Sequence, residues 1–138
     1  MFHSVNSEAL AREIERVAEK RGVVQDILLE VNIAGEASKQ GAAPETVRAL
    51  TGLCASLPHV RLCGLMAVAP YSEDPEDSRP FFAALRQLLQ ELRPAAADPE
   101  AFCELSMGMS GDFETAIEEG ATLIRVGSSI FGARDYKK

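Results

Sequence analysis

The stretch ELSMGMSGDFETAIEEGATLIRVGSSIFGARDY, residues 104–136, contains the pattern that decides the fold. Two short apolar runs each end in a turn rich in glycine and serine, at 106–111 and at 127–129, and an amphipathic segment separates them. A strand, a helix and a second strand of these lengths predict a parallel β-α-β unit with a right-handed crossover. Both turns then fall at the carboxyl ends of neighbouring strands, where ligands bind in parallel α/β proteins.

The rest of the chain repeats this alternation of strand and helix. Short apolar runs alternate with segments whose apolar residues recur every three or four positions, such as Leu10, Ile14 and Val17. The pattern predicts strands at 2–5, 26–33, 60–70, 103–107 and 122–127, and helices at 7–20, 44–57, 78–92 and 112–120.

Two architectures fit five parallel strands and four helices: an open doubly wound sheet and part of a (β/α)8 barrel. A complete barrel needs eight units and about 250 residues, so a barrel reading of these 138 residues is a partial one. We expect a single domain over 1–138, because neither repeats nor low-complexity segments divide the chain.

Composition excludes several classes of protein. The net charge of −7 argues against a nucleic-acid surface or an anionic membrane surface, since both require clustered positive charge. No apolar run approaches the roughly 18 residues that span a bilayer, and no segment reads as a signal peptide. The three cysteines, Cys54, Cys63 and Cys103, lack metal-site spacing and predict free, buried thiols in a cytoplasmic protein.

Familiar catalytic motifs do not fit. GMSGD, at 108–112, has Asp112 where a serine-hydrolase turn needs glycine, and no histidine follows His59. The chain has neither a dinucleotide-binding GxGxxG nor a P-loop; the loop around Lys39 has the wrong spacing. The carboxylates near the first turn predict helix capping and helix-dipole interactions rather than a metal site. They are Glu104, Asp112 and Glu114.

The two turns themselves predict an anion site. Backbone N–H groups of 108–111 and 127–129, with the hydroxyls of Ser110 and Ser128, can point at one phosphate, and glycine lets the main chain come close. The alternative is a pair of tight turns whose small residues serve packing, and spacing alone leaves the two readings equal. Arg125 favours the anion site, because it lies within a predicted strand on the same face as Gly127 and a buried charge needs a partner.

Several motifs in order resemble one family. LSMGMSGDF, EGATLIRVGSSIFGARDY and VNIAGEASKQG closely resemble the pyridoxal 5′-phosphate (PLP) homeostasis proteins, relatives of the amino-terminal barrel of alanine racemase. The resemblance implies a (β/α) barrel that carries PLP, has little or no racemase activity and manages the vitamin B6 pool. It also implies that Ser110, Gly127 and Ser128 contact the phosphate. Arg125 would face the pyridine nitrogen, and Met107, Gly108 and Met109 would line the pocket.

The resemblance covers the chain but not the whole family pattern. Family members begin with three further strands, the first of which carries the Schiff-base lysine in a VSK motif. That motif is missing here, and none of the lysines, Lys20, Lys39, Lys137 and Lys138, ends a strand in an equivalent place. We therefore expect a carboxyl-terminal portion that lacks the first three β/α units.

This truncated barrel should not be an enzyme, and it should bind PLP non-covalently at best, or a free phosphate or sulfate ion. Its exposed barrel edges should promote self-association. The alternatives are an assembly module with a vestigial pocket and a residual PLP enzyme of the racemase type.

Overall fold

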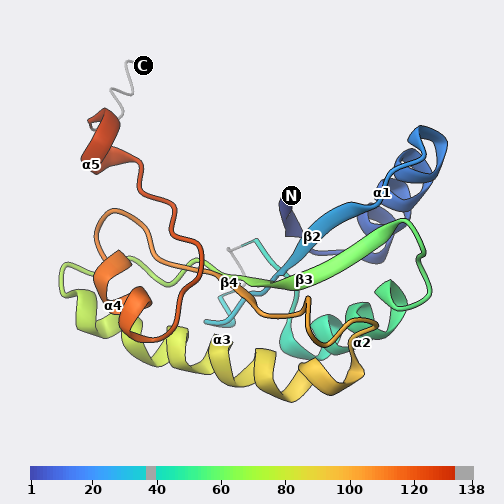
Figure 1. Cartoon of the computed structure of the whole chain (residues 1–138). Helices are drawn as coiled ribbons and strands as arrows, with labels where there is room; N and C mark the ends of the chain where they lie inside the picture. Colours follow the sequence, from blue (N-terminus) through green and yellow to red (C-terminus); the bar gives the residue numbers. More distant parts are fainter. Residues whose placement is uncertain (37–39, 133–138) are drawn as a thin grey trace.

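A four-stranded parallel sheet in sequential order forms the centre of the computed structural model, which describes residues 1–36 and 40–132 (Figure 1). The strands are β1 (Phe2–Val5), β2 (Gln25–Glu30), β3 (Val60–Met66) and β4 (Glu104–Ser106). The helices are α1 (Glu8–Arg21), α2 (Pro44–Cys54), α3 (Arg79–Leu92), α4 (Phe113–Glu118) and α5 (Ser128–Phe131), with 3₁₀ turns η1 (Pro75–Ser78) and η2 (Arg93–Ala95).

Local sequence signals set the bounds of the first helix. The hydroxyl of Ser7, at the N-cap of α1, accepts a hydrogen bond from the N–H of Leu10. Gly22 ends α1 in the left-handed conformation, with φ of 65°, which glycine adopts without a steric cost. The predicted helix at 7–20 is therefore confirmed.

Helices α1 to α4 all pack on one face of the sheet. Ile14 of α1, Leu50 of α2 and Phe82 of α3 belong to the same buried cluster as the β2 residues Ile27 and Leu29. A doubly wound sheet would carry helices on both faces and reverse its strand order. Sequential order with helices on one side is the arrangement of part of a (β/α) barrel, so the predicted fold class is confirmed.

The opposite face of the sheet is the inner face of this partial barrel. It carries a small apolar cluster of Leu28, Cys63 and Met66, against which Leu123 packs. A bidentate ion pair joins Asp26 of β2 to Arg61 of β3, with N–O distances of 2.7 and 2.9 Å. The inner face is thus much more polar than the face that the helices cover.

The predicted strand at 122–127 forms only a single bridge, between Leu123 and Ser106. Its backbone still follows β4, because the N–H of Met107 donates to the carbonyl of Leu123 and the N–H of Arg125 donates to that of Gly108. β4 is three residues long and offers little backbone to pair with. The five predicted strands are thus four strands and a bridged segment.

Two further predictions need correction. Cys103 is exposed, whereas Cys54 and Cys63 are buried as expected. Cys103 directly precedes the short β4, outside the cluster that the helices cover. The turn predicted at 127–129 opens into the short helix α5, which stands away from the sheet (Figure 1).

Candidate functional site

A hollow of about 680 Å³ lies at the carboxyl ends of β3, β4 and the Leu123 segment. Three stretches of chain line it: 68–72 after β3, 109–112 after β4, and the chain around α5. The lining residues are Val68, Ala69, Pro70, Tyr71, Ser72, Met109, Ser110, Gly111, Asp112, Gly127, Ser128, Phe131 and Gly132. Ligands of parallel α/β proteins bind at this end of the sheet.

Ser110 joins the two glycine-serine turns at the wall of this hollow. Its Oγ accepts hydrogen bonds from the N–H of Gly127 at 3.0 Å and from the N–H of Ser129 at 3.3 Å. The structure thus brings together Ser110, Gly127 and Ser128, three residues that the sequence predicted for the site. Two backbone donors converge on one oxygen atom, as backbone donors around a bound anion do. Their contact with a phosphate stays a prediction.

Asp112 shapes the turn that presents Ser110. Its Oδ1 accepts from the N–H of Met109 at 2.7 Å, and its Oδ2 accepts from the hydroxyl of Ser78 at 3.0 Å. The sequence predicted a capping side chain for α4, and that was wrong: Asp112 holds the N-cap position, but its carboxylate makes no capping bond to the helix. The carboxylate instead closes the turn and ties it to the start of α3.

The residues before Ser110 divide between core and hollow. Met109 is partly exposed and lines the hollow. Met107, which was predicted to line the pocket, is 0% exposed and packs in the helix-side core. Gly108 has a φ of 92°, and a Cβ there would lie 2.6 Å from Cβ of Ala116, so glycine lets the turn sit against α4. Gly108 backs the turn and does not itself line the hollow.

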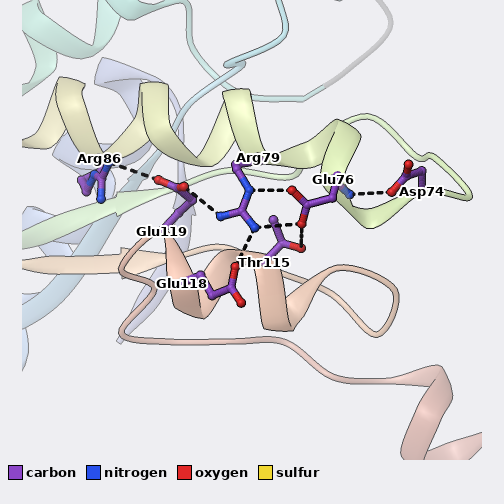
Figure 2. A network of polar contacts seen from close by, with 7 residues as sticks. All are labelled: Asp74, Glu76, Arg79, Arg86, Thr115, Glu118 and Glu119. Carbon is purple, nitrogen blue, oxygen red and sulfur yellow. Dashed lines mark hydrogen bonds and ion pairs between the residues drawn. The ribbon is translucent and has the colours of Figure 1, made fainter.

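A network of ion pairs on the outer surface fixes α4 against α3 (Figure 2). Arg79 forms ion pairs with Glu76 at 2.7 Å, Glu118 at 2.6 Å and Glu119 at 3.0 Å, and Arg86 forms a further one with Glu119 at 3.1 Å. These contacts raise the pKa of Arg79, chiefly through its hydrogen bond to Glu76. Since α4 follows the Ser110 turn directly, the network helps to hold that turn in place.

Arg125 lies half-buried on the inner face. Its Nη1 donates to Oγ of Ser106 at 2.5 Å, and its Nη2 donates to the carbonyl of Ala67 at 2.8 Å. Burial lowers the pKa of Arg125, while the negative charges of Asp112 and Glu30 partly offset this effect. Burial raises the pKa of Glu30, and the charge of Arg125 opposes that shift. The predicted need of Arg125 for polar partners is therefore met; its contact with a ring nitrogen stays a prediction.

Sequence reasoning missed two residues that accompany Arg125. The Oγ of Ser106, which is fully buried, lies 3.0 Å from Nδ1 of His3, a residue 103 positions earlier in the chain. No local pattern links β1 to β4. The available signal was a polar residue in each of two short predicted strands.

Among the described residues, no lysine lines the hollow. Lys20 lies in the last turn of α1, which leads into the amino end of β2 and therefore lies at the opposite end of the sheet from the hollow. Lys39, Lys137 and Lys138 fall outside the described ranges. Within 1–36 and 40–132, no group of three or more acidic, cysteine or histidine side chains could hold a metal ion. In the same ranges, no helix is long and apolar enough to cross a membrane.

Comparison with known families identifies the class of this partial barrel. The family model for the alanine racemase N-terminal domain matches residues 1–135, so the chain belongs to that family. Among curated relatives, the chain is 48% identical to the pyridoxal phosphate homeostasis protein of Aquifex aeolicus over 136 residues, covering 99% of this chain and 59% of the relative. It is 36% identical to the human protein of the same name, covering all of this chain and 52% of the relative.

Solved structures agree with this assignment. PipY of Synechococcus elongatus, with PLP bound, superposes with a TM-score of 0.82 at 36% identity, over 94% of this chain and 59% of PipY. Alanine racemase of Corynebacterium glutamicum shares the fold, with a TM-score of 0.71 at 16% identity, over 94% of this chain and 36% of the enzyme. The predicted resemblance to the PLP homeostasis proteins is confirmed, and the chain spans between half and three-fifths of the length of these curated relatives.

Proposed function

We propose that this chain binds PLP non-covalently and serves, like the homeostasis proteins it resembles, in handling the cofactor rather than in catalysis. The observation that carries the proposal is the convergence of the Gly127 and Ser129 N–H groups on Oγ of Ser110, at the wall of an open hollow. A phosphate oxygen that takes the place of this hydroxyl would accept both bonds. The Ser110 hydroxyl would then turn and donate to the phosphate.

Arg125 supports a role in binding over a role in catalysis. It lies two residues before Gly127, and the family resemblance implies that it faces the pyridine nitrogen. A guanidinium is a donor that does not lose its proton. An arginine opposite the pyridine nitrogen keeps that nitrogen unprotonated. PLP enzymes that form carbanions use the ring as an electron sink, which this arrangement weakens. We therefore infer that racemase or lyase activity is absent.

The binding would be non-covalent because no described lysine reaches the hollow. In our interpretation the chain corresponds to the carboxyl-terminal portion of the relatives and contains their phosphate-binding half. Inorganic phosphate or sulfate should occupy the same site more weakly, because these ions lack the ring that would contact the rest of the hollow.

Titration with PLP, followed by calorimetry and thermal shift, tests this proposal, with pyridoxal as the ligand that lacks a phosphate. We expect the chain to bind PLP but not pyridoxal. Ser110→Ala should lower the affinity for PLP about tenfold or more, because hydrogen bonds to a charged group are stronger than those between neutral groups. Ser128→Ala should give a smaller loss. Ser56→Ala is the matched control, since its hydroxyl bonds the carbonyl of Leu53 in an exposed turn away from the hollow.

Two results would count against the proposal. Equal affinity of the Ser110→Ala and Ser56→Ala variants for PLP would show that the phosphate does not bind at Ser110. A lysine adduct, detected by mass spectrometry after borohydride reduction, would show that the binding is covalent.

A second function, assembly, has its own observation. Among the described residues, the backbone of β1 pairs only with β2, and Phe2 of this edge strand is 53% exposed. Edge strands that expose apolar side chains associate with other chains. We expect light scattering coupled to size exclusion to show a dimer or a larger species at micromolar concentration. A monodisperse monomer at every concentration tested would contradict this function.

A further inference from the structure

Three side chains from distant parts of the chain meet on the inner face and form a relay defined by His3, Ser106 and Arg125. Arg125 donates to Oγ of Ser106, and that oxygen lies 3.0 Å from Nδ1 of His3. Ser106 is fully buried and His3 is half-buried. Resting on the proposed PLP site, we infer that His3 is a positioning residue: in its neutral form it holds Arg125 in place through Ser106.

The direction of this relay is inferred from the hydrogen-bonding groups of Ser106 and Arg125. A serine hydroxyl has one proton to donate, and a guanidinium can only donate. Arg125 therefore uses an acceptor site of Oγ. Among the described residues, Nδ1 of His3 is the remaining side-chain partner of that hydroxyl, so the Ser106 proton points to Nδ1. The serine oxygen could accept a second bond, but only an unprotonated Nδ1 gives the Ser106 proton a side-chain acceptor among the described residues, so we assign His3 the neutral tautomer with its proton on Nε2.

Protonation of His3 would break this arrangement. With a proton on Nδ1, Oγ of Ser106 would face two donors, and its own proton would have no partner among residues 1–36 and 40–132. A positive His3 would also repel Arg125. The charged groups that act on His3 are Arg125 and the amino terminus, and both, together with burial as the largest cause, lower its pKa. The relay is therefore intact near neutral pH and opens in acid.

The consequence concerns the ring end of the site rather than the phosphate end. Nη2 of Arg125 is tied to the carbonyl of Ala67, at the end of β3, and Nη1 is tied to Ser106 in β4. These two bonds fix the plane of the guanidinium across the sheet. If His3 releases Ser106, one of the two anchors loosens and Arg125 turns away from the position that the ring nitrogen requires.

Nuclear magnetic resonance of the protein without PLP tests the relay directly, because the chain has only two histidines, His3 and His59. We expect the imidazole nitrogens of His3 to show the Nε2–H tautomer at pH 7, with a pKa below the ordinary value of about 6.5. His59, which pairs with Glu15, supplies the second assigned signal. An Nδ1–H tautomer or a charged imidazole at pH 7 would overturn the inference.

Two substitutions separate positioning from simple packing. His3→Asn keeps an oxygen acceptor near the place of Nδ1 but cannot titrate, whereas His3→Ala removes the acceptor. We expect His3→Ala to weaken PLP binding about 2- to 10-fold at pH 7, the range for one neutral hydrogen bond, and His3→Asn to restore it. As the pH falls below about 6.5, through the lowered pKa of His3, affinity relative to His3→Asn should fall for the native chain. His59→Asn is the control and should follow the native pH profile.

The arms of this experiment have distinct outcomes. Parallel pH profiles for the native chain and His3→Asn, or unchanged affinity in His3→Ala, would refute the positioning role. If the native chain binds no PLP, the proposed function fails. Two measurements without PLP then test the relay on their own. One is the tautomer and pKa of His3, and the other compares the exchange of the Arg125 guanidinium protons in Ser106→Ala and in the native chain.

Discussion

The two faces of the sheet differ in what they contribute to the molecule. The helix-covered face is a continuous apolar core in which Leu29, Leu65 and Phe82 are almost completely buried. The inner face combines a small apolar cluster with the Asp26–Arg61 ion pair and the relay of His3, Ser106 and Arg125. Burial of apolar area stabilises the fold, whereas buried polar groups contribute little net stability but require defined partners. One face therefore holds the structure, and the other positions chemical groups.

Truncation of a core side chain should produce the largest effect. Phe82→Ala removes a ring that is 1% exposed from the helix-side cluster, and such changes cost about 3–5 kcal/mol because the cavity is only partly refilled. Urea unfolding measures the loss. Phe131→Ala is the matched control, because that side chain is 85% exposed and its loss should change stability by about 0.5 kcal/mol or less. Equal losses in the two variants would contradict the contrast.

The contact between β3 and β4 comes next. A Cβ at Gly64 would lie 1.9 Å from the carbonyl oxygen of Glu104, so Gly64→Ala must push the two strands apart, at a cost of about 1–3 kcal/mol. Gly52→Ala offers the opposite case, because nothing lies within 4 Å and the residue is inside α2. It should stabilise the protein by about 0.5–1 kcal/mol in the same unfolding assay. A stable Gly64→Ala variant would mean that the strands do not approach this closely.

The ion pair of the inner face should appear as a dependence of stability on pH. The hydrogen bond from Arg61 lowers the pKa of Asp26 below its unfolded value of about 3.9. The pair therefore stabilises the fold above about pH 4, and this contribution is lost as the pH falls through the folded-state pKa. Asp26→Asn should lose stability at pH 7 and show a smaller further loss in acid. If the free energy of unfolding falls equally in acid for the native chain and Asp26→Asn, the Asp26–Arg61 pair does not stabilise the fold.

The network in Figure 2 should give the smallest effect on global stability. Its carboxylates are largely exposed except Glu119, so solvent and salt screen the interactions of Arg79. Arg79→Ala should lower the melting temperature slightly, and the difference from the native chain should shrink as sodium chloride is raised. Arg12→Ala, which removes an isolated exposed pair with Glu8, is the control with one partner. A salt-independent difference would indicate a packing role instead.

Local patterns predicted most of the fold, because strand and helix periods extend over a few residues. Ser7 and Gly22, which the sequence predicted at the two ends of the first helix, are the residues that cap α1 in the structure. The strand expected at 122–127 was shortened to a bridge, since its pairing depends on the length of β4 and not on its own composition. The sequence also did not show on which side of the sheet each turn residue lies. Met107 was expected to line the pocket, but it packs in the helix-side core.

The candidate site divides in the same way. Ser110 and Gly127 could be found because each belongs to a local pattern, glycine and serine at the end of a predicted strand, and the structure brings them together. His3 and Ser106 could not be found, because their contact joins the first strand to the last one across the inner face. A pair of that kind depends on how the sheet curls, which no window of sequence contains.

In the proposed site, the hydroxyl of Ser110 holds the place of a ligand oxygen. It already satisfies the amides of Gly127 and Ser129, so an arriving phosphate would replace it as their acceptor and would gain a bond from the released hydroxyl. Such an exchange would leave neither state with orphaned donors, and the two loops would need no rearrangement to admit or release a phosphate. On this proposal the site is pre-formed without its ligand.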